Sequence, residues 1–139
     1  MAFSAGFNGL VKLDASPGGS LTDYSAYVTS LDLDLPVELL DTTTFGKTQR
    51  TRIAGLKDLT GTITFNSDPT ITAVIAGLLQ SSETISFEFG PEGSTAASGQ
   101  LKLTGECMLG GMSTSTAVDG LNTFSVPISG SDTTTVGTY

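Results

Sequence analysis

Residues 31–35 read Leu-Asp-Leu-Asp-Leu, a strict alternation of apolar and acidic side chains. Successive side chains of a β-strand point to opposite faces, so three leucines share one face while Asp32 and Asp34 share the other. The stretch therefore predicts a strand that turns one face toward a core and the other toward solvent.

The same alternation recurs along the chain and predicts a mainly antiparallel β-sandwich or barrel-like domain. Clear patterns occupy residues 62–65, 85–89, 101–103 and 124–128, and weaker ones occupy 7–13, 24–30 and 106–112. Between two of them, residues 90–93 (Gly-Pro-Glu-Gly) carry Pro at the second and Gly at the fourth position of a type I turn. We therefore expect residues 85–89 and 101–103 to form a hairpin.

One flanking α-helix is predicted over about residues 68–80. Asp68 is a suitable N-cap and Pro69 suits the first helical position. The apolar side chains fall at helical spacing and should pack on a sheet: Ile71, Val74, Ile75, Leu78 and Leu79. The opposite face carries no charge, which is compatible with a second packing surface or with a plain exterior.

Length and composition predict a single domain over residues 1–139. A chain of 139 residues buries roughly 68–70% of its unfolded surface. No apolar run approaches the roughly 18 residues of a membrane span, and the first ten residues lack the basic start of a signal peptide. The single cysteine, Cys107, excludes an intramolecular disulfide. We expect a soluble protein that is synthesised in a cytoplasm and binds no membrane.

The missing residue types argue against catalysis. The chain has no histidine, which excludes Ser-His-Asp and Cys-His nucleophiles and histidine-bearing metal sites. Cys107 lies in a strand-like stretch and is expected to be a small buried residue. Asp32 and Asp34 are the best local carboxylate pair, but no calcium-type loop and no third ligand surrounds them. We expect no enzyme, no catalytic residue, no cofactor and no metal.

Residues 38–58 stand apart from this pattern. They hold four of the six basic residues, Lys47, Arg50, Arg52 and Lys57, and show almost no core-like alternation. A long inter-strand loop of about twenty residues without regular structure is uncommon in a compact domain and is usually functional or disordered. A protein docking arm, a solvated loop and a nucleic-acid contact all remain open. The net charge of −8 opposes phosphate binding and favours the docking arm.

Six short blocks, taken in order, resemble the tail tube (major tail) proteins of long-tailed bacteriophages. They are residues 42–46 (TTTFG), 51–58 (TRIAGLKD), 60–65 (TGTITF), 89–94 (FGPEGS), 118–120 (VDG) and 124–130 (FSVPISG). The resemblance covers most of the chain from about residue 31 to residue 130, with a lone helix after the third block.

The resemblance implies a structural virion protein of the phage tail. Its copies would self-assemble into hexameric rings that stack into a tube, through which DNA passes without specific binding. Tape-measure, tail-terminator and distal tail proteins would be its other partners. The basic loop would be an inter-subunit arm that orders against a neighbour, with these contact residues: Thr42, Thr43, Thr44, Phe45, Gly46, Lys47, Arg50, Arg52 and Lys57.

The resemblance also assigns roles to the acidic strand faces and to the end of the chain. Asp32, Asp34 and Glu88 are candidates for the lumen lining, although a plain solvent face explains them equally well in a monomer. The polar tail at residues 131–139 would be either a second contact that orders on assembly or a frayed end. Two other functions stay open: the inner tube of a contractile injection device, and a virion decoration or carbohydrate-binding β-sandwich.

Overall fold

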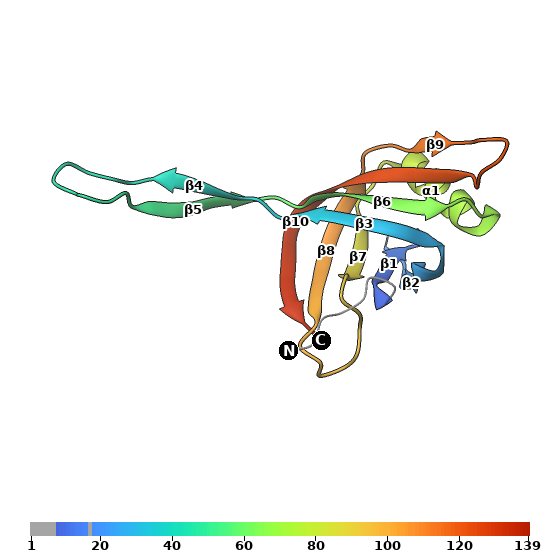
Figure 1. The fold of residues 1–139 in the computed structure, drawn as a ribbon, viewed down its shortest axis with the longest axis horizontal. Coiled ribbons are helices and arrows are strands. Elements are labelled where there is room, and N and C mark those ends of the chain that lie inside the picture. The colour runs from blue at the N-terminus through green and yellow to red at the C-terminus, as the bar shows by residue number, and fades with distance from the viewer. Residues whose placement is uncertain (1–7, 17) are drawn as a thin grey trace.

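The computed structural model describes residues 8–16 and 18–139. It is mainly β, with an eight-stranded antiparallel sheet, a separate two-stranded sheet and one α-helix (Figure 1). The elements are β1 (Leu10–Asp14), β2 (Leu21–Asp23), the 3-10 turn η2 (Ser25–Tyr27), β3 (Val28–Asp34), β4 (Val37–Asp41), β5 (Arg52–Lys57), β6 (Thr60–Asn66), α1 (Pro69–Ser81), β7 (Ile85–Gly90), β8 (Leu101–Leu109), β9 (Ser113–Ser115) and β10 (Thr123–Thr138). In the described ranges, no helix is long and apolar enough to cross a membrane.

The long strand β10 belongs to both halves of the large sheet. Its first half pairs with β6 and its second half pairs with β8, and Ile128 faces both Gly61 and Leu109. The register shifts between Ser131 and Thr134, as in a β-bulge, which bends a strand and increases its twist. β10 turns downward from the layer of β3 and β6 into the layer of β8, β7 and β1 (Figure 1). This doubled-over sheet confirms the sandwich or barrel-like prediction.

The core fills the space between the two halves of the sheet. The Phe65 and Phe124 rings stack with centroids 5.0 Å apart, and those of Phe87 and Phe89 stack at 4.7 Å. All four rings are fully buried. These rings lie in the stretches where apolar and polar residues alternate. The alternation therefore correctly identified the side chains that point into the core. The predicted hairpin is also confirmed, since β7 pairs with β8 and Gly93 donates its backbone N–H to the Gly90 carbonyl oxygen at 3.1 Å.

The helix prediction is confirmed as well. Asp68 accepts a hydrogen bond from the Thr70 backbone N–H at 2.9 Å, and Pro69 opens the helix. Ile71, Ile75 and Leu78 are buried in the core. Helix α1 lies at the end of the molecule opposite the β4–β5 hairpin (Figure 1).

Residues 38–58 have more regular structure than the sequence indicates. The expectation of an irregular stretch is wrong for both flanks, which form β4 and β5, and the part between these strands, residues 42–51, is a loop. The strands escaped detection because neither has a buried face. Without a core side, their apolar residues need not alternate, and β4 reads Val-Glu-Leu-Leu-Asp.

The polar residues 131–139 are not a frayed tail, because they pair with a strand of their own chain. Residues up to Thr138 continue β10 along β8, and the Tyr139 backbone N–H donates to the Gln100 carbonyl oxygen at 2.9 Å. Backbone hydrogen bonds with β8 hold this run although it has few apolar side chains.

Three weaker strand predictions also need adjustment. Residues 25–27 form η2, and the strand begins at Val28. The patterns at 101–103 and 106–112 merge into the single strand β8, and the pattern at 7–13 corresponds to β1, with its first residue outside the described part of the chain.

Candidate functional site: a projecting arm

Residues 37–57, hereafter the arm, project from the body as a two-stranded ribbon (Figure 1). Leu39 pairs with Ala54 and Leu40 with Ile53, so successive pairs point to opposite faces of the ribbon. Within the described residues, β4 and β5 pair only with each other. An isolated two-stranded hairpin is marginally stable in water, so the arm lacks the support that a sheet usually has.

Large apolar side chains of the arm face solvent. Leu39 is 63% exposed and Leu56 is 81% exposed, while Phe45 in the loop is fully exposed at 108%. Three more contribute: Val37, Leu40 and Ile53. Leu39 and Leu40 lie on opposite faces, so apolar surface is present on both sides of the ribbon. Exposed apolar surface rimmed by polar residues is typical of a protein interaction site.

The far end of the arm, residues 41–52, is hereafter the tip, and hydrogen bonds close it. Asp41 accepts from the Thr43 backbone N–H at 2.9 Å and from Arg50 Nη1 at 2.8 Å. The Thr51 backbone N–H donates to Thr43 Oγ1 at 3.0 Å, and the hydroxyls of Thr42 and Thr51 lie 3.0 Å apart. The hydrogen bonds from Thr43, together with the Arg50 contact, lower the pKa of Asp41 below its usual value. The tip therefore has internal order that the sequence did not reveal.

The four basic residues of the arm are not equivalent. Arg50 is paired with Asp41 of its own chain, although its side chain is 70% exposed. In the described ranges no carboxylate pairs with Lys47, Arg52 or Lys57. All four are predicted contact residues of the arm, and Arg50 differs from the other three because it is paired within its own chain.

The three candidate lumen residues lie in different halves of the sheet. Asp32 and Asp34 are exposed on β3, an edge strand of the large sheet, opposite Thr62 and Thr60 of β6. Glu88 lies on β7, in the other half of the sheet. The structure brings Asp32 and Asp34 together but keeps Glu88 apart from them.

Glu88 is also neutralised by its surroundings. Lys12 Nζ lies 3.8 Å from one carboxylate oxygen and Lys102 Nζ lies 3.9 Å from the other. The Tyr139 hydroxyl donates to Glu88 at 3.1 Å. Burial and the Glu88 carboxylate together raise the pKa of Tyr139 to about 12. The sequence could not show this cluster, because its members come from β1, β7, β8 and the residue after β10.

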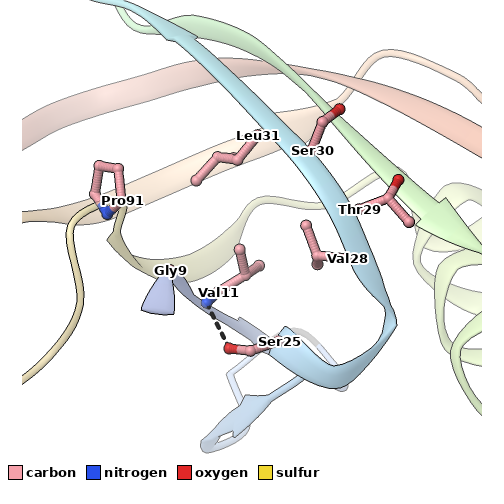
Figure 2. Close-up of a pocket in the computed structure, with 8 residues that line it drawn as sticks. All are labelled: Gly9, Val11, Ser25, Val28, Thr29, Ser30, Leu31 and Pro91. Atoms are coloured by element: carbon pink, nitrogen blue, oxygen red, sulfur yellow. Dashed lines mark hydrogen bonds between the residues drawn. The ribbon is translucent and has the colours of Figure 1, made fainter. Parts of the chain in front are cut away.

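Figure 2 shows a pocket between β1 and β3, and the described residues that line it carry no charge. Val11, Val28, Leu31 and Pro91 supply its apolar wall, and the Val11 backbone N–H donates to Ser25 Oγ at 2.9 Å.

A second pocket, hereafter the root groove, lies where the arm joins the body. Leu35, Leu56 and Val136 supply apolar surface, and Asp58 and Asp132 supply carboxylates. The remaining lining residues are Gly55, Lys57, Leu59, Gly130 and Thr134.

Other chemistry finds little support in the described residues. Across residues 8–16 and 18–139, no three His, Cys, Asp or Glu side chains come together in a way that could hold a metal ion. Cys107 is fully buried, and burial raises the pKa of its thiol to about 12. A thiol of this kind is a core residue rather than a nucleophile.

No protein-family model and no curated protein matches the sequence. Solved structures do match in fold. A chain in the tail of an empty gene transfer agent (GTA) particle, determined by helical refinement with C6 symmetry, superposes with a TM-score of 0.79 at 14% identity, over 94% of this chain and 96% of that one. The SPP1 tail tube protein gives 0.73 at 16% identity, over 98% and 80%. A chain of the sheath–tube complex of an extracellular contractile injection system gives 0.68 at 9% identity, over 98% and 92%.

Proposed function

We propose that this chain is a structural subunit that self-assembles into stacked rings and forms the tail tube of a phage-like particle. The observation that carries the proposal is the arm, a hairpin that leaves the body and exposes apolar side chains on both faces. Such a ribbon gains stability when a second surface covers it. A neighbouring copy is the partner that a tube supplies at every position.

The shared fold supports the same function. The superpositions extend over nearly the whole chain rather than over one motif, and they include a tail with sixfold symmetry and a tail tube. We infer six subunits per ring and a location in the virion tail. A tape-measure protein, a tail terminator and a distal tail protein are the further partners we propose.

The lumen of such a tube would be lined in part by β3. Asp32 and Asp34 are exposed, and the hydroxyl side chains of Thr60 and Thr62 lie beside them on β6. Unpaired carboxylates repel DNA phosphates, which favours passage without binding. Glu88 would contribute little to this field because two lysines lie beside it. We propose that the chain performs no catalysis.

A second candidate is the inner tube of a contractile injection device. It is favoured by the superposition on a chain of the sheath–tube complex of such a device. Both functions need the same ring-forming subunit. They differ in whether a sheath surrounds the tube, so binding of a sheath protein to assembled tubes distinguishes them.

Electron microscopy of the purified protein tests the proposal, with and without a tail initiator complex. We expect rings or tubes with a central channel. Persistent monomers under all assembly conditions would contradict it. The decoration or carbohydrate-binding alternative instead expects a ligand cleft and an arm that can be deleted without loss of oligomerisation.

A further inference from the structure

Two features of the arm lie at its opposite ends and complement each other. Phe45, at the tip, is 108% exposed. The root groove, at the other end, has an apolar wall to which Leu56 and Val136 contribute, and these side chains are 81% and 58% exposed. An exposed aromatic ring and an open groove with an apolar wall both place apolar surface in contact with water. Insertion of the ring into the groove would remove this surface from water, which is favourable.

The groove has room for an aromatic side chain. Its volume of about 630 Å³ lies within the range of pockets that hold small organic molecules. Gly130 lets β10 approach Leu59 closely beside the groove, because a Cβ there would lie 2.9 Å from the Leu59 Cβ. Asp132 lines the groove from the bulge in β10, where its φ is 65°. Aspartate tolerates this left-handed conformation better than most residues.

Phe45 cannot reach the root groove of its own chain. The extended ribbon carries the chain from Pro36 at the root to Phe45 at the tip, a reach of about 30 Å at 3.3 Å per residue. The arm points away from the body along its whole length (Figure 1). A Phe45 ring that enters the groove must therefore come from another copy of the chain.

The charges of the tip and the groove favour this contact between two copies. Residues 41–52, the tip, contain three basic residues and one acidic residue, a net charge of +2, in a protein of net charge −8. Outside residues 38–58 the chain has 11 acidic and 2 basic residues, a net charge of −9. The root groove has Asp58 and Asp132 against the single cation Lys57. A basic tip and an acidic groove attract each other and fix the direction of docking.

We propose that Phe45 of one copy inserts into the root groove of the next copy, with Lys47 and Arg52 facing Asp58 and Asp132. The inference rests on the proposed function and specifies its contact. The surface that inserts, the tip with Phe45, and the surface that receives it, the root groove, lie about one arm length apart on each chain. The contact is therefore head to tail, and such contacts build rings or helical filaments rather than closed dimers.

Cross-linking between two single-site variants tests this contact directly. Thr44→Cys chains, which keep Phe45, are mixed with Val136→Cys chains that carry a size tag, and a short bismaleimide is added. Thr44 is exposed beside Phe45 in the tip. Cys107 is buried with a thiol pKa of about 12, so the native cysteine should not react. We expect a mixed cross-link wherever the tip of a Thr44→Cys chain meets the groove of a Val136→Cys chain. The matched control replaces Thr44→Cys by Val118→Cys, because Val118 is fully exposed at 109% but lies outside the arm.

The outcomes separate this inference from the proposed function. Rings or tubes that form without the Thr44–Val136 cross-link would overturn the inference and leave the function intact. Equal cross-linking by the Val118 control would overturn it too. Absence of both assemblies and cross-links would count against inference and function together.

A mixing experiment checks the direction of the contact. Phe45→Asp chains lack the aromatic ring that inserts but keep an intact root groove. Val136→Asp chains keep Phe45 but have a charged group in the root groove. Each variant alone should stay monomeric, whereas an equimolar mixture should stop at heterodimers. Phe45→Ala should weaken self-association by roughly 30-fold, the loss expected when a buried aromatic anchor is truncated. Longer oligomers in the mixture would contradict a head-to-tail contact.

Discussion

Arg50 Nη1 lies 2.8 Å from Asp41 Oδ2, and this ion pair joins the two sides of the arm at the start of its loop. Asp41 also accepts the Thr43 backbone N–H at 2.9 Å. A single carboxylate thus binds both the Thr43 amide and the Arg50 side chain at the tip that presents Phe45. Arg50 is paired inside the subunit, so the inter-subunit charge contacts that we propose are those of Lys47 and Arg52.

The order of the tip should depend on pH through Asp41. Its folded pKa is lowered, so the stabilisation is present above the ordinary aspartate value of 3.8 and is lost as the pH falls through the lower folded pKa. Hydrogen exchange at the Thr43 amide measures this directly. Asp41→Asn should reduce protection of that amide at neutral pH, whereas Glu38→Gln, on the same strand, should leave it unchanged.

Removing the arm should leave the body folded. Asp34 at the end of β3 pairs with Thr60 at the start of β6, so the arm is an insertion between two neighbouring antiparallel strands. A short Asn-Gly-type turn in place of residues 36–58 can connect them. We expect a cooperative thermal transition and a circular dichroism spectrum typical of the body, together with no rings or tubes. Tubes formed by the shortened chain would exclude the arm as the assembly element.

Charge reversal separates the two arginines of the arm. Arg52→Glu should weaken assembly and leave amide exchange in the tip unchanged, because Arg52 makes no ion pair in the described chain. Arg50→Glu should increase amide exchange in the tip, since it places a second acidic group beside Asp41. Sedimentation velocity and hydrogen exchange on both variants give the two measurements. Identical behaviour of the variants would refute this division of roles.

The Phe65–Phe124 stack should contribute strongly to the free energy of unfolding. Both rings are fully buried, and truncation of a buried Phe to Ala typically costs about 3–5 kcal/mol. Urea denaturation of Phe65→Ala measures the loss. Thr62→Ala is the matched control on the same strand, because its partly exposed side chain lies on the opposite face.

The pKa of Tyr139 should depend on the charge of Glu88. Its pKa of about 12 results first from burial and then from the Glu88 carboxylate. Glu88→Gln removes the second cause, so the tyrosine should ionise at lower pH while remaining above its ordinary value. Ultraviolet titration, with Tyr139→Phe as the reference that isolates this ring, measures the change. An unaltered titration would mean that the 3.1 Å contact does not persist in solution.

The sequence by itself determined the strands that have one buried face. Alternation at residues 62–65, 85–89 and 124–128 identified the inward side chains, because burial of one face imposes a period of two. Capping by Asp68 and the apolar stripe of α1 determined the helix in the same way, from local chemistry. The concentration of basic residues in the arm was likewise visible in the chain alone.

Only the tertiary structure decided which separated segments meet. β4 and β5 have no buried face, and the second half of β10 has few apolar residues, so these strands are defined by hydrogen bonds to distant partners rather than by a pattern. The same dependence on long-range pairing put Glu88 beside Lys12, Lys102 and Tyr139 instead of beside Asp32. It also formed the root groove from β5, the segment before β6 and the bulge of β10. Side-chain periodicity records which face is buried, but it carries no information on which strand lies alongside.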